Sequence, residues 1–391
     1  MPGPLDGFRI LDLSAVISGP FATMILADQG ADVIKVEPPG SGDFTRSAGN
    51  RQGGLSASFL NNNRNKRSVV LDLKRSGHVE ALKRIAATCD AMVQNFRPGV
   101  VERLGIGYED MRAVNPGLVY ASISGFGEVG PWSHKPVYDP IIQALSGLCS
   151  VQGGADERRP RLIRTIVPDK VTALTAAQAI TAALLARSRT GEGQHVRLSM
   201  LDAVVAFLWS SDMGSQTYVG KDISIQRAAS FLDLIYETAD GYMAVSTMTN
   251  GQWQAFCHAS GNAEWIDDER FATTALRDLN IDARLELIQS AMIAKSTAEW
   301  MAILDEAGVP CAPVLHRKDM IHHPQVVANE IVREYDHPHA GRLRQSRPAA
   351  RFEGTGSEHR FGARPLGEDT ASVLAEVGYG EAEVKALLAA G

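Results

Sequence analysis

The first forty residues alternate between apolar runs and a segment of small residues, and this order limits the fold most. Residues 8–14 ("FRILDLS") and 32–39 ("DVIKVEPP") are short apolar runs that are typical of buried strands. Between them, residues 19–31 ("GPFATMILADQGA") have the composition of a helix that ends near Gly30. A strand, a helix and a second strand in this order predict a β-α-β unit and therefore a parallel sheet.

The same alternation continues through the first half of the chain. We expect a helix at residues 78–89, strands at 90–96 and 118–124, a long helix at 169–191 with Gly191 at its exit, and a strand at 193–200. Strands that alternate with helices favour an α/β fold with helices on both faces of the sheet. We therefore predict a large Rossmann-like domain over residues 1–200.

The pattern changes near residue 220. Residues 234–248 ("LIYETADGYMAVSTM") predict a hairpin with Asp-Gly at its turn, and charged, helical segments follow. We expect a linker at 201–224, a small α+β domain at 225–320, and a return linker with the C-terminal part of the large domain at 321–391.

Composition argues against several classes of protein. The chain has 391 residues, a formal net charge of -6 and 45% hydrophobic residues, so we expect a sizeable core and no general nucleic-acid surface. Neither a signal peptide nor an apolar run long enough to span a bilayer is apparent, and the four cysteines lack metal-ligand spacing. We expect a cytoplasmic protein without a membrane partner or a bound metal.

Common catalytic motifs fit poorly. Residues 125–130 ("GFGEVG") match a dinucleotide-binding pattern, but no clear helix follows, so tight turns are the better interpretation. The nucleophile elbow of serine hydrolases does not occur. Basic residues gather in residues 61–75 ("NNNRNKRSVVLDLKR") and at Arg97 and Arg103. They form either a solvated face or a pocket for phosphates.

Asp169 follows Pro168 at the start of the long helix. An aspartate at this place is most often an N-cap. The helix N-terminus also favours an ionised carboxylate, and an unperturbed pKa near 3.9 keeps it charged at neutral pH. Such a carboxylate can attack an activated electrophile such as a thioester without a general base.

An ordered set of segments identifies a resemblance along essentially the whole chain. It comprises "RILDLS", "LADQGADVIKVEPPGSGDFTR", "NNRNKRSVVLDLK", "QNFRPGVVERLG", "YASISGFGEVGP", "YDPIIQALSG", the "PD" before the long helix and "TGEGQHVRLSMLDAV". Together they resemble the family III CoA-transferases of the carnitine and bile-acid (CaiB/BaiF) type. The resemblance implies a Rossmann-like large domain, a small domain and a homodimer of interlocked subunits.

The resemblance also implies a mechanism and a set of site residues. CoA would pass from an acyl-CoA to a carboxylic acid through a mixed anhydride and a CoA thioester on Asp169, with CoA as substrate and no metal or tightly bound cofactor. Tyr138 would line the pantetheine or active site, and Phe96 can equally be a core residue. The matching CoA-contacting positions are Leu71, Leu73, Asn95, Phe96 and Arg103.

Three departures leave alternatives open. Ile17 replaces a glutamine that formyl-CoA transferases carry in the first turn, which suggests a larger or more apolar acyl group. A glycine-run loop is missing, and residues 225–237 stand in its place. An α-methylacyl-CoA racemase of the same fold would pair Asp169 with a histidine, but Tyr138 occupies that position. A CoA-binding protein without turnover is the other alternative, and the sequence names neither donor nor acceptor acid.

Overall fold

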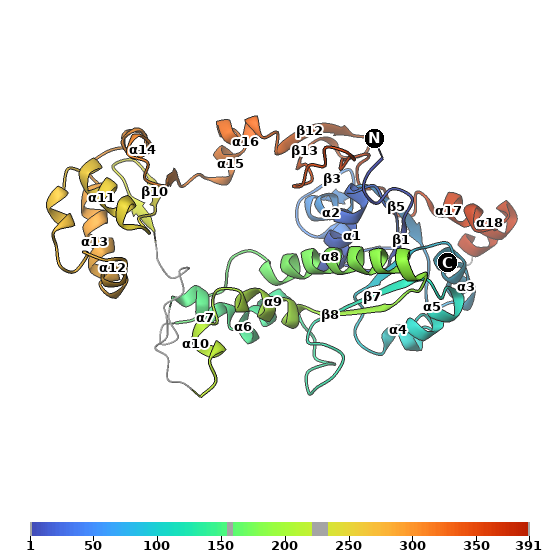
Figure 1. The fold of residues 1–391 in the computed structure, drawn as a ribbon. Helices are drawn as coiled ribbons and strands as arrows, with labels where there is room; N and C mark the ends of the chain where they lie inside the picture. The colour runs from blue at the N-terminus through green and yellow to red at the C-terminus, as the bar shows by residue number, and fades with distance from the viewer. Residues whose placement is uncertain (1, 155–158, 221–233, 390–391) are drawn as a thin grey trace. The chain divides into compact units, whose positions relative to one another are not determined.

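The computed structural model describes residues 2–154, 159–220 and 234–389 (Figure 1). The chain divides into two compact units, one from the ranges 1–152, 159–222 and 329–391 and the other from the ranges 153–158 and 223–328. We call them the large and the small unit. Most of segment 225–237, which stands in place of the glycine-run loop, lies outside the described residues.

A six-stranded parallel sheet forms the centre of the large unit. Its strand order is β5-β2-β1-β6-β7-β8. The order reverses direction between β1 and β6, as in doubly wound dinucleotide-binding folds. This finding confirms the predicted Rossmann-like sheet. The strands are β1 (Arg9–Asp12), β2 (Asp32–Glu37), β5 (Lys66–Val70), β6 (Ala91–Gln94), β7 (Val119–Ser124) and β8 (His195–Ser199).

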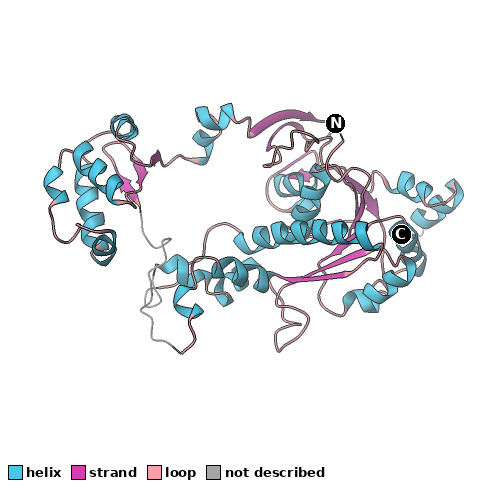
Figure 2. Ribbon diagram, in the orientation of Figure 1, coloured by secondary structure: helices cyan, strands magenta, loops and turns pink. Residues whose placement is uncertain are grey.

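Helices cover both faces of this sheet, as Figure 2 shows. Successive strand residues point to opposite faces, so Ile10 joins a core with α1 (Ser18–Asp28) and α8 (Val167–Thr190), whereas Leu11 joins a core with α3 (Ser76–Ala87). The second core also receives α5 (Tyr108–Val114), α17 (Thr370–Glu376) and α18 (Glu381–Ala389). Apolar residues on both sides of each strand therefore explain the continuous apolar runs.

The long helix α8 packs directly on α1 because its buried side consists largely of alanine, including Ala173, Ala176 and Ala177. Among the described residues, α8 is the one helix that is long and apolar enough to cross a membrane. In the fold it lies against the sheet beside β7 (Figure 1). Gly191 ends the helix in the left-handed conformation, as the sequence predicted.

Shorter elements complete the large unit. They are η1 (Phe44–Ser47), β3 (Arg51–Gln52), β4 (Leu55–Ser56), α2 (Ala57–Asn63), α4 (Val100–Arg103), α6 (Asp139–Leu145), α7 (Leu148–Gly153), α9 (Met200–Trp209), α10 (Gly214–Thr217), β12 (Val332–His337) and β13 (Gly341–Ser346). Residues 201–209, which we expected to begin a linker, belong to α9. Its apolar side packs against α6 through Ile142, so the large unit extends beyond residue 200.

The small unit contains a three-stranded antiparallel sheet and a group of helices. Residues 234–248 form the expected hairpin of β9 (Ile235–Glu237) and β10 (Tyr242–Val245), and β11 (Cys311–Pro313) pairs with β10. Trp253 and Trp300 are buried in its core, where Trp300 donates to the Met292 carbonyl. The helical elements are α11 (Asn250–Ala259), η3 (Ala263–Ile266), α12 (Thr274–Leu279), α13 (Ile281–Met292), α14 (Thr297–Glu306), α15 (Arg317–Met320) and α16 (Pro324–Ala328).

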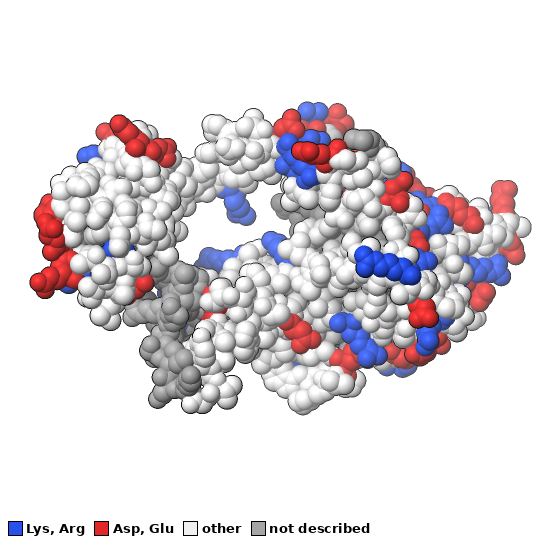
Figure 3. Space-filling model, viewed as in Figure 1, with Lys and Arg blue, Asp and Glu red and all other residues white. Residues whose placement is uncertain are grey.

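Charged side chains of both signs are intermixed on the face of the large unit that Figure 3 shows. Acidic and basic groups lie next to one another there instead of forming one basic surface. This distribution matches the formal net charge of -6 and offers no extended field for a polyanion on that face.

Candidate active site

A cavity of about 260 Å³ lies where the carboxyl ends of the central strands meet. It is bordered by the turn after β1 through Val16 and Ser18, and by the turn after β6 through Asn95 and Phe96. These two strands flank the point where the strand order reverses, which is where ligands bind in open α/β sheets. Asp169 lines the same cavity.

Asp169 lies in the first turn of α8 but does not cap it. The helix begins at Val167 after the N-cap residue Ile166, and no side chain caps it. Asp169 is therefore the third helical residue. The interpretation of Asp169 as the N-cap is wrong, because Pro168 takes an early helical position, which suits proline, and the helix starts one turn sooner.

The Asp169 carboxyl is partly buried at the edge of the cavity. Burial, together with the negative charge of Asp139, raises its pKa to about 6, although hydrogen bonds from the side chain and main chain of Ser18 favour the ionised form. The sequence had led us to expect an ordinary, low pKa. The carboxyl is still about nine-tenths ionised at pH 7, and its incomplete solvation makes it a stronger nucleophile than a surface aspartate.

Asp139 anchors the start of α8 from the first turn of α6. Its Oδ2 accepts the Asp169 N–H at 3.2 Å, and its Oδ1 accepts from Gln143 Nε2 at 2.6 Å. Gln143 in turn accepts from the Ile163 N–H at 2.9 Å. This chain of hydrogen bonds attaches the segment before α8 to α6 and so fixes where Asp169 points.

The turn after β1 faces Asp169 through two of its residues. Val16 and Ser18 line the cavity, whereas Ile17 between them does not. Val16 has φ 72°, a conformation that a β-branched residue adopts only under constraint. Gly19 permits the turn to close on α1, since a Cβ there would lie 2.2 Å from the Ser14 Cβ.

The predicted CoA-contacting residues are distributed unequally. Asn95, Phe96 and Tyr138 line the Asp169 cavity, and Tyr138 is 73% exposed. Both polar atoms of the Asn95 side chain bond the Ala15 main chain, at 2.8 and 2.7 Å. Phe96 also packs against the core beside α3.

The other three predicted contacts lie outside this cavity. Leu71 is buried and Leu73 is half-buried in the core after β5, so only their main chains can meet a ligand. Arg103 is exposed at the end of α4. A CoA molecule that meets all of these positions would extend along the carboxyl edge of the sheet from β5 to β7.

The basic cluster of residues 61–75 is used largely inside the fold. Arg64 pairs with Asp28 at 2.6 Å, and Lys66 pairs with Asp12 at 3.0 Å, all of them buried. For these two residues both earlier interpretations, a solvated face and a phosphate pocket, are wrong. The segment also contains β5, whose two basic residues, serine and two valines are not recognised as a strand from the sequence alone.

Most of the residues that line the cavity were not among the predicted site residues, and Ser18, Arg97, Lys135 and Asp139 are the ones that matter for the chemistry. A sequence signal existed for two of them. Ser18 follows the first strand of a doubly wound sheet, where ligands are commonly met, and Asp139 precedes a proline at a helix start. Lys135 and Arg97 add positive charge that could meet an anionic substrate.

Other cavities lack comparable chemistry. One of about 450 Å³ around β12 and β13 is larger, but its charged groups Arg333 and Glu334 belong to exposed ion pairs. A neighbouring cavity of about 420 Å³ shares Phe96 and Arg97 with the Asp169 cavity and extends to His195. Within the described ranges, no cluster of three or more histidine, cysteine or acidic side chains is arranged to hold a metal ion.

The chain is similar to known proteins along most of its length. Residues 5–370 match the family model described as CoA-transferase family III. The chain is 36% identical to the succinyl-CoA:glutarate CoA-transferase of Mus musculus, over 99% of this chain and 90% of that protein. It is 36% identical to the acetyl-CoA:oxalate CoA-transferase of Acetobacter aceti, over 84% and 85%. A crystal structure of a CaiB/BaiF family protein from Brucella suis superposes with a TM-score of 0.82 at 30% identity, over 96% of this chain and 100% of the other.

Proposed function

This chain belongs to CoA-transferase family III, and we propose that it moves CoA from an acyl-CoA to a carboxylic acid through covalent intermediates on Asp169. Membership of the family confirms the resemblance seen in the sequence. The protein is thus a CoA-transferase of the EC 2.8.3 type. The single observation that supports Asp169 is its desolvated carboxyl in a cavity at the carboxyl edge of the sheet.

The proposed reaction has four acyl transfers. An Asp169 oxygen attacks the thioester carbonyl, the C–S bond breaks and CoA departs as the thiolate. The product on the protein is a mixed anhydride between Asp169 and the donor acid. The thiolate then attacks the aspartyl carbonyl of the anhydride. The donor carboxylate departs, and an aspartyl-CoA thioester is formed. The acceptor carboxylate attacks this thioester and expels the thiolate. The thiolate finally attacks the acceptor's carbonyl, which yields the new acyl-CoA and restores Asp169.

The contacts of Ser18 support this assignment. In the two middle transfers the tetrahedral carbon is that of Asp169 itself, so negative charge develops on an Asp169 oxygen. The hydrogen bonds that Ser18 makes to the ionised carboxyl are suited to this oxygen. A donor of this kind is worth about 3–4 kcal/mol in other acyl-transfer enzymes.

For the substrates we propose a dicarboxylate as the acceptor and the CoA thioester of another short carboxylic acid as the donor. Two similar proteins are named for succinyl-CoA with glutarate and for acetyl-CoA with oxalate. Lys135 and Arg97 line the Asp169 cavity and could pair with a second carboxylate while the first reacts. Neutral walls from Val16 and Val137 leave room for methylene groups between the two.

The racemase alternative needs a second base beside Asp169. Among the described residues that line this cavity none is a histidine, and His134 lines the neighbouring cavity instead. No observation favours α-proton transfer over acyl transfer. The chain's similarity to named transferases also supports turnover over simple CoA binding.

We propose a cytoplasmic homodimer. Large apolar side chains remain exposed along α8 and α9 of the single chain, among them Leu174, Leu185 and Phe207. Such residues are typical of an interface between subunits. Light scattering at micromolar concentration should give twice the mass of the chain; a monomeric particle would contradict the dimer.

A panel of acyl-CoA donors and mono- and dicarboxylate acceptors tests the proposed activity, with new thioesters identified by mass spectrometry. We expect exchange with at least one dicarboxylate pair. Tight acyl-CoA binding without exchange into any acid would instead indicate a binding protein. Exchange of the α-hydrogen for solvent deuterium without an acceptor would indicate a racemase.

A further inference from the structure

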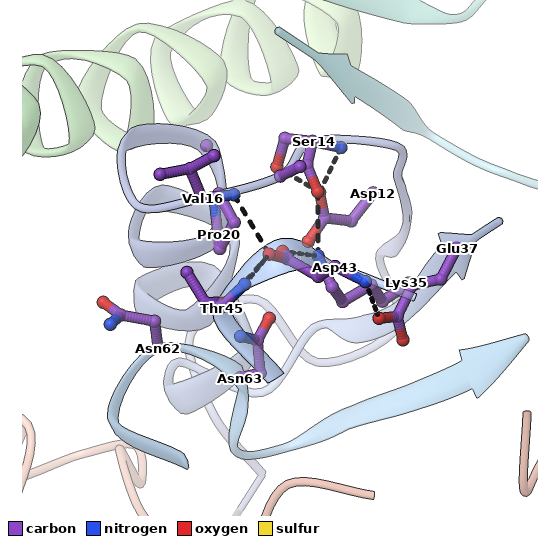
Figure 4. Close-up of polar contacts among 12 residues, drawn as sticks. Asp12, Ser14, Val16, Pro20, Lys35, Glu37, Asp43, Thr45, Asn62 and Asn63 are labelled. Atoms are coloured by element: carbon purple, nitrogen blue, oxygen red, sulfur yellow. Dashed lines mark hydrogen bonds and ion pairs between the residues drawn. The ribbon is translucent and has the colours of Figure 1, made fainter. Parts of the chain in front are cut away.

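The segment Ser14–Val16, which precedes the Asp169-facing Ser18, is held by side chains rather than by main-chain hydrogen bonds. Five consecutive main-chain groups, from the Ser14 N–H to the Val16 N–H, each meet a polar side chain. We call the four side chains that hold them the cradle; it consists of Asp12, Lys35, Asp43 and Asn95 (Figure 4 shows the first three).

Each member of the cradle has its own task. Asp12 Oδ1 accepts the Ser14 N–H at 2.9 Å, and Lys35 Nζ donates to the Ser14 carbonyl at 2.8 Å. Asn95 bonds both polar groups of the Ala15 main chain. Asp43 Oδ1 accepts the Val16 N–H at 3.3 Å. Asp12 is the last residue of β1, Lys35 lies within β2, Asn95 directly follows β6, and Asp43 is the N-cap of η1.

A balanced group of buried charges makes the cradle rigid. Lys35 pairs with Asp43 Oδ2 at 3.0 Å, while Lys66 pairs with Asp12 and Arg46 with Glu37. All six are almost fully buried, and three positive charges meet three negative ones. A buried ion pair of this kind is weak evidence for stability, and its best-attested use is to specify one conformation.

The conformation that the cradle specifies is strained. A β-branched residue such as valine rarely adopts φ 72°, and this conformation persists only where its surroundings fix it. Val16, Ser18 and Asp169 line the same cavity, where the donors of Ser18 favour the ionised form of the Asp169 carboxyl. Strained residues that are fixed in this way cluster at active sites, where they contribute to pre-organisation.

We propose that Asp43 is a positioning residue, which holds Val16 in its left-handed conformation through the cradle and thereby places the Ser18 donors on the Asp169 carboxyl. Asp43 itself does not line the cavity. It is fixed by the Thr45 N–H and hydroxyl on Oδ1 and by Lys35 on Oδ2. The effect of Asp43 on turnover rests on the proposed function, whereas its effect on the conformation of Val16 does not.

The test compares Asp43→Ala with the milder Asp43→Asn, which keeps an acceptor for the Val16 N–H but loses the ion pair with Lys35. Asp28→Asn is the matched control, because it removes another buried carboxylate charge, that of the Arg64 pair, outside the cradle. Chemical denaturation first establishes that each variant is folded.

Two readouts need no substrate. Amide hydrogen exchange of the peptide around residues 13–18 should become about tenfold faster in Asp43→Ala, because the Val16 N–H loses its acceptor. Carbodiimide labelling of the Asp169 carboxyl across pH, read by peptide mass spectrometry, should shift its midpoint upward by about one pH unit as the Ser18 donors move away. The other charged or titratable groups that line the cavity, Arg97, Lys135, Tyr138 and Asp139, are unchanged in the variants.

A third readout uses turnover. With an active donor and acceptor pair, Asp43→Ala should lower kcat about tenfold and leave the KM for acyl-CoA within about twofold, and Asp43→Asn should fall between it and the wild type. Ser18→Ala combined with Asp43→Ala should lose less than the product of the two single effects, because both act on the same hydrogen bonds.

An unshifted labelling midpoint in Asp43→Ala overturns the proposal, and so does an equal shift in Asp28→Asn. A rise in KM alone would also overturn it, since that result would assign Asp43 to substrate binding. If the wild type transfers no CoA between any pair of acids, the proposed function fails, whereas the labelling and exchange experiments still decide the role of Asp43.

Discussion

The main-chain N–H of Asp169 donates a hydrogen bond to Oδ2 of Asp139, so two carboxylates from different helices lie close together at one cavity. The same contact therefore positions the backbone of Asp169 and makes ionisation of its side chain less favourable. Ser18 opposes this effect from the start of α1. Burial, the charge of Asp139 and the opposing donors of Ser18 together determine how much Asp169 is charged at neutral pH.

The first prediction concerns pH. The nucleophile is the anion, and the pKa of Asp169 is raised to about 6, first by burial and second by Asp139. The rate of the first acyl transfer should therefore fall tenfold per unit below about pH 6 and level off above pH 7. Single-turnover release of CoA thiolate between pH 4.5 and 8 measures this. A rate that stays constant down to pH 4.5 would contradict the raised pKa.

The second prediction concerns Asp139→Asn. Removal of the negative charge should lower the pKa of Asp169 and shift the acid limb to lower pH by about one unit. The variant should also lose about 1–3 kcal/mol of stability, because asparagine has one acceptor oxygen where Asp139 accepts from both Gln143 and the Asp169 N–H. Asp202→Asn, in the first turn of α9, serves as control. If the acid limb of the pH–rate profile is unchanged in Asp139→Asn, the charge of Asp139 does not raise the pKa of Asp169.

The third prediction is that Asp169→Asn stabilises the fold at neutral pH. The pKa of about 6 in the folded protein lies above the ordinary value of 3.8 for an aspartate. The folded protein therefore binds the proton more tightly, and ionisation lowers the stability of the fold as pH rises from about 4 to 6. The variant should gain up to about 3 kcal/mol at pH 7.5 and almost nothing below pH 4. Urea denaturation at both values measures the difference. Equal stability of both proteins at pH 7.5 would contradict the claim that the ionised Asp169 carboxylate destabilises the fold.

The fourth prediction tests the CoA contact that lies outside the cavity. If Arg103 meets the 3′-phosphate, Arg103→Ala should weaken CoA about tenfold or more and leave dephospho-CoA unchanged, as expected for one charged hydrogen bond. Arg112→Ala removes another exposed arginine, on α5, and should change neither affinity. Calorimetric titration gives both constants. Equal weakening of the two ligands would place Arg103 elsewhere on CoA.

Sequence periodicity predicted the central sheet well because its strands are apolar on both faces. Residues 8–14, 32–39 and 118–124 each contain at least three apolar residues, and each contains a strand. Strand β5 was missed because Lys66 and Arg67 interrupt the apolar pattern. Lys66 is buried only because Asp12 lies opposite to it, which is a tertiary contact that no local pattern reveals.

At the candidate active site, too, local sequence patterns do not reveal contacts between distant segments. Position and family resemblance identified Asp169, but its raised pKa depends on Asp139, thirty residues earlier in the chain. Likewise, the strain at Val16 arises from side chains that reach it from other strands. Interactions between distant segments therefore set the chemistry of this site, whereas local sequence sets its location.

Covalent trapping at Asp169 tests the central claim most directly. The wild-type protein is incubated with acyl-CoA, treated with hydroxylamine or borohydride, and digested for peptide mass spectrometry. We predict a modified peptide that contains Asp169, which is absent without acyl-CoA and absent from Asp169→Asn, together with loss of transfer in that variant. Normal transfer by Asp169→Asn, or turnover by the wild type with no modification at Asp169, would contradict the account.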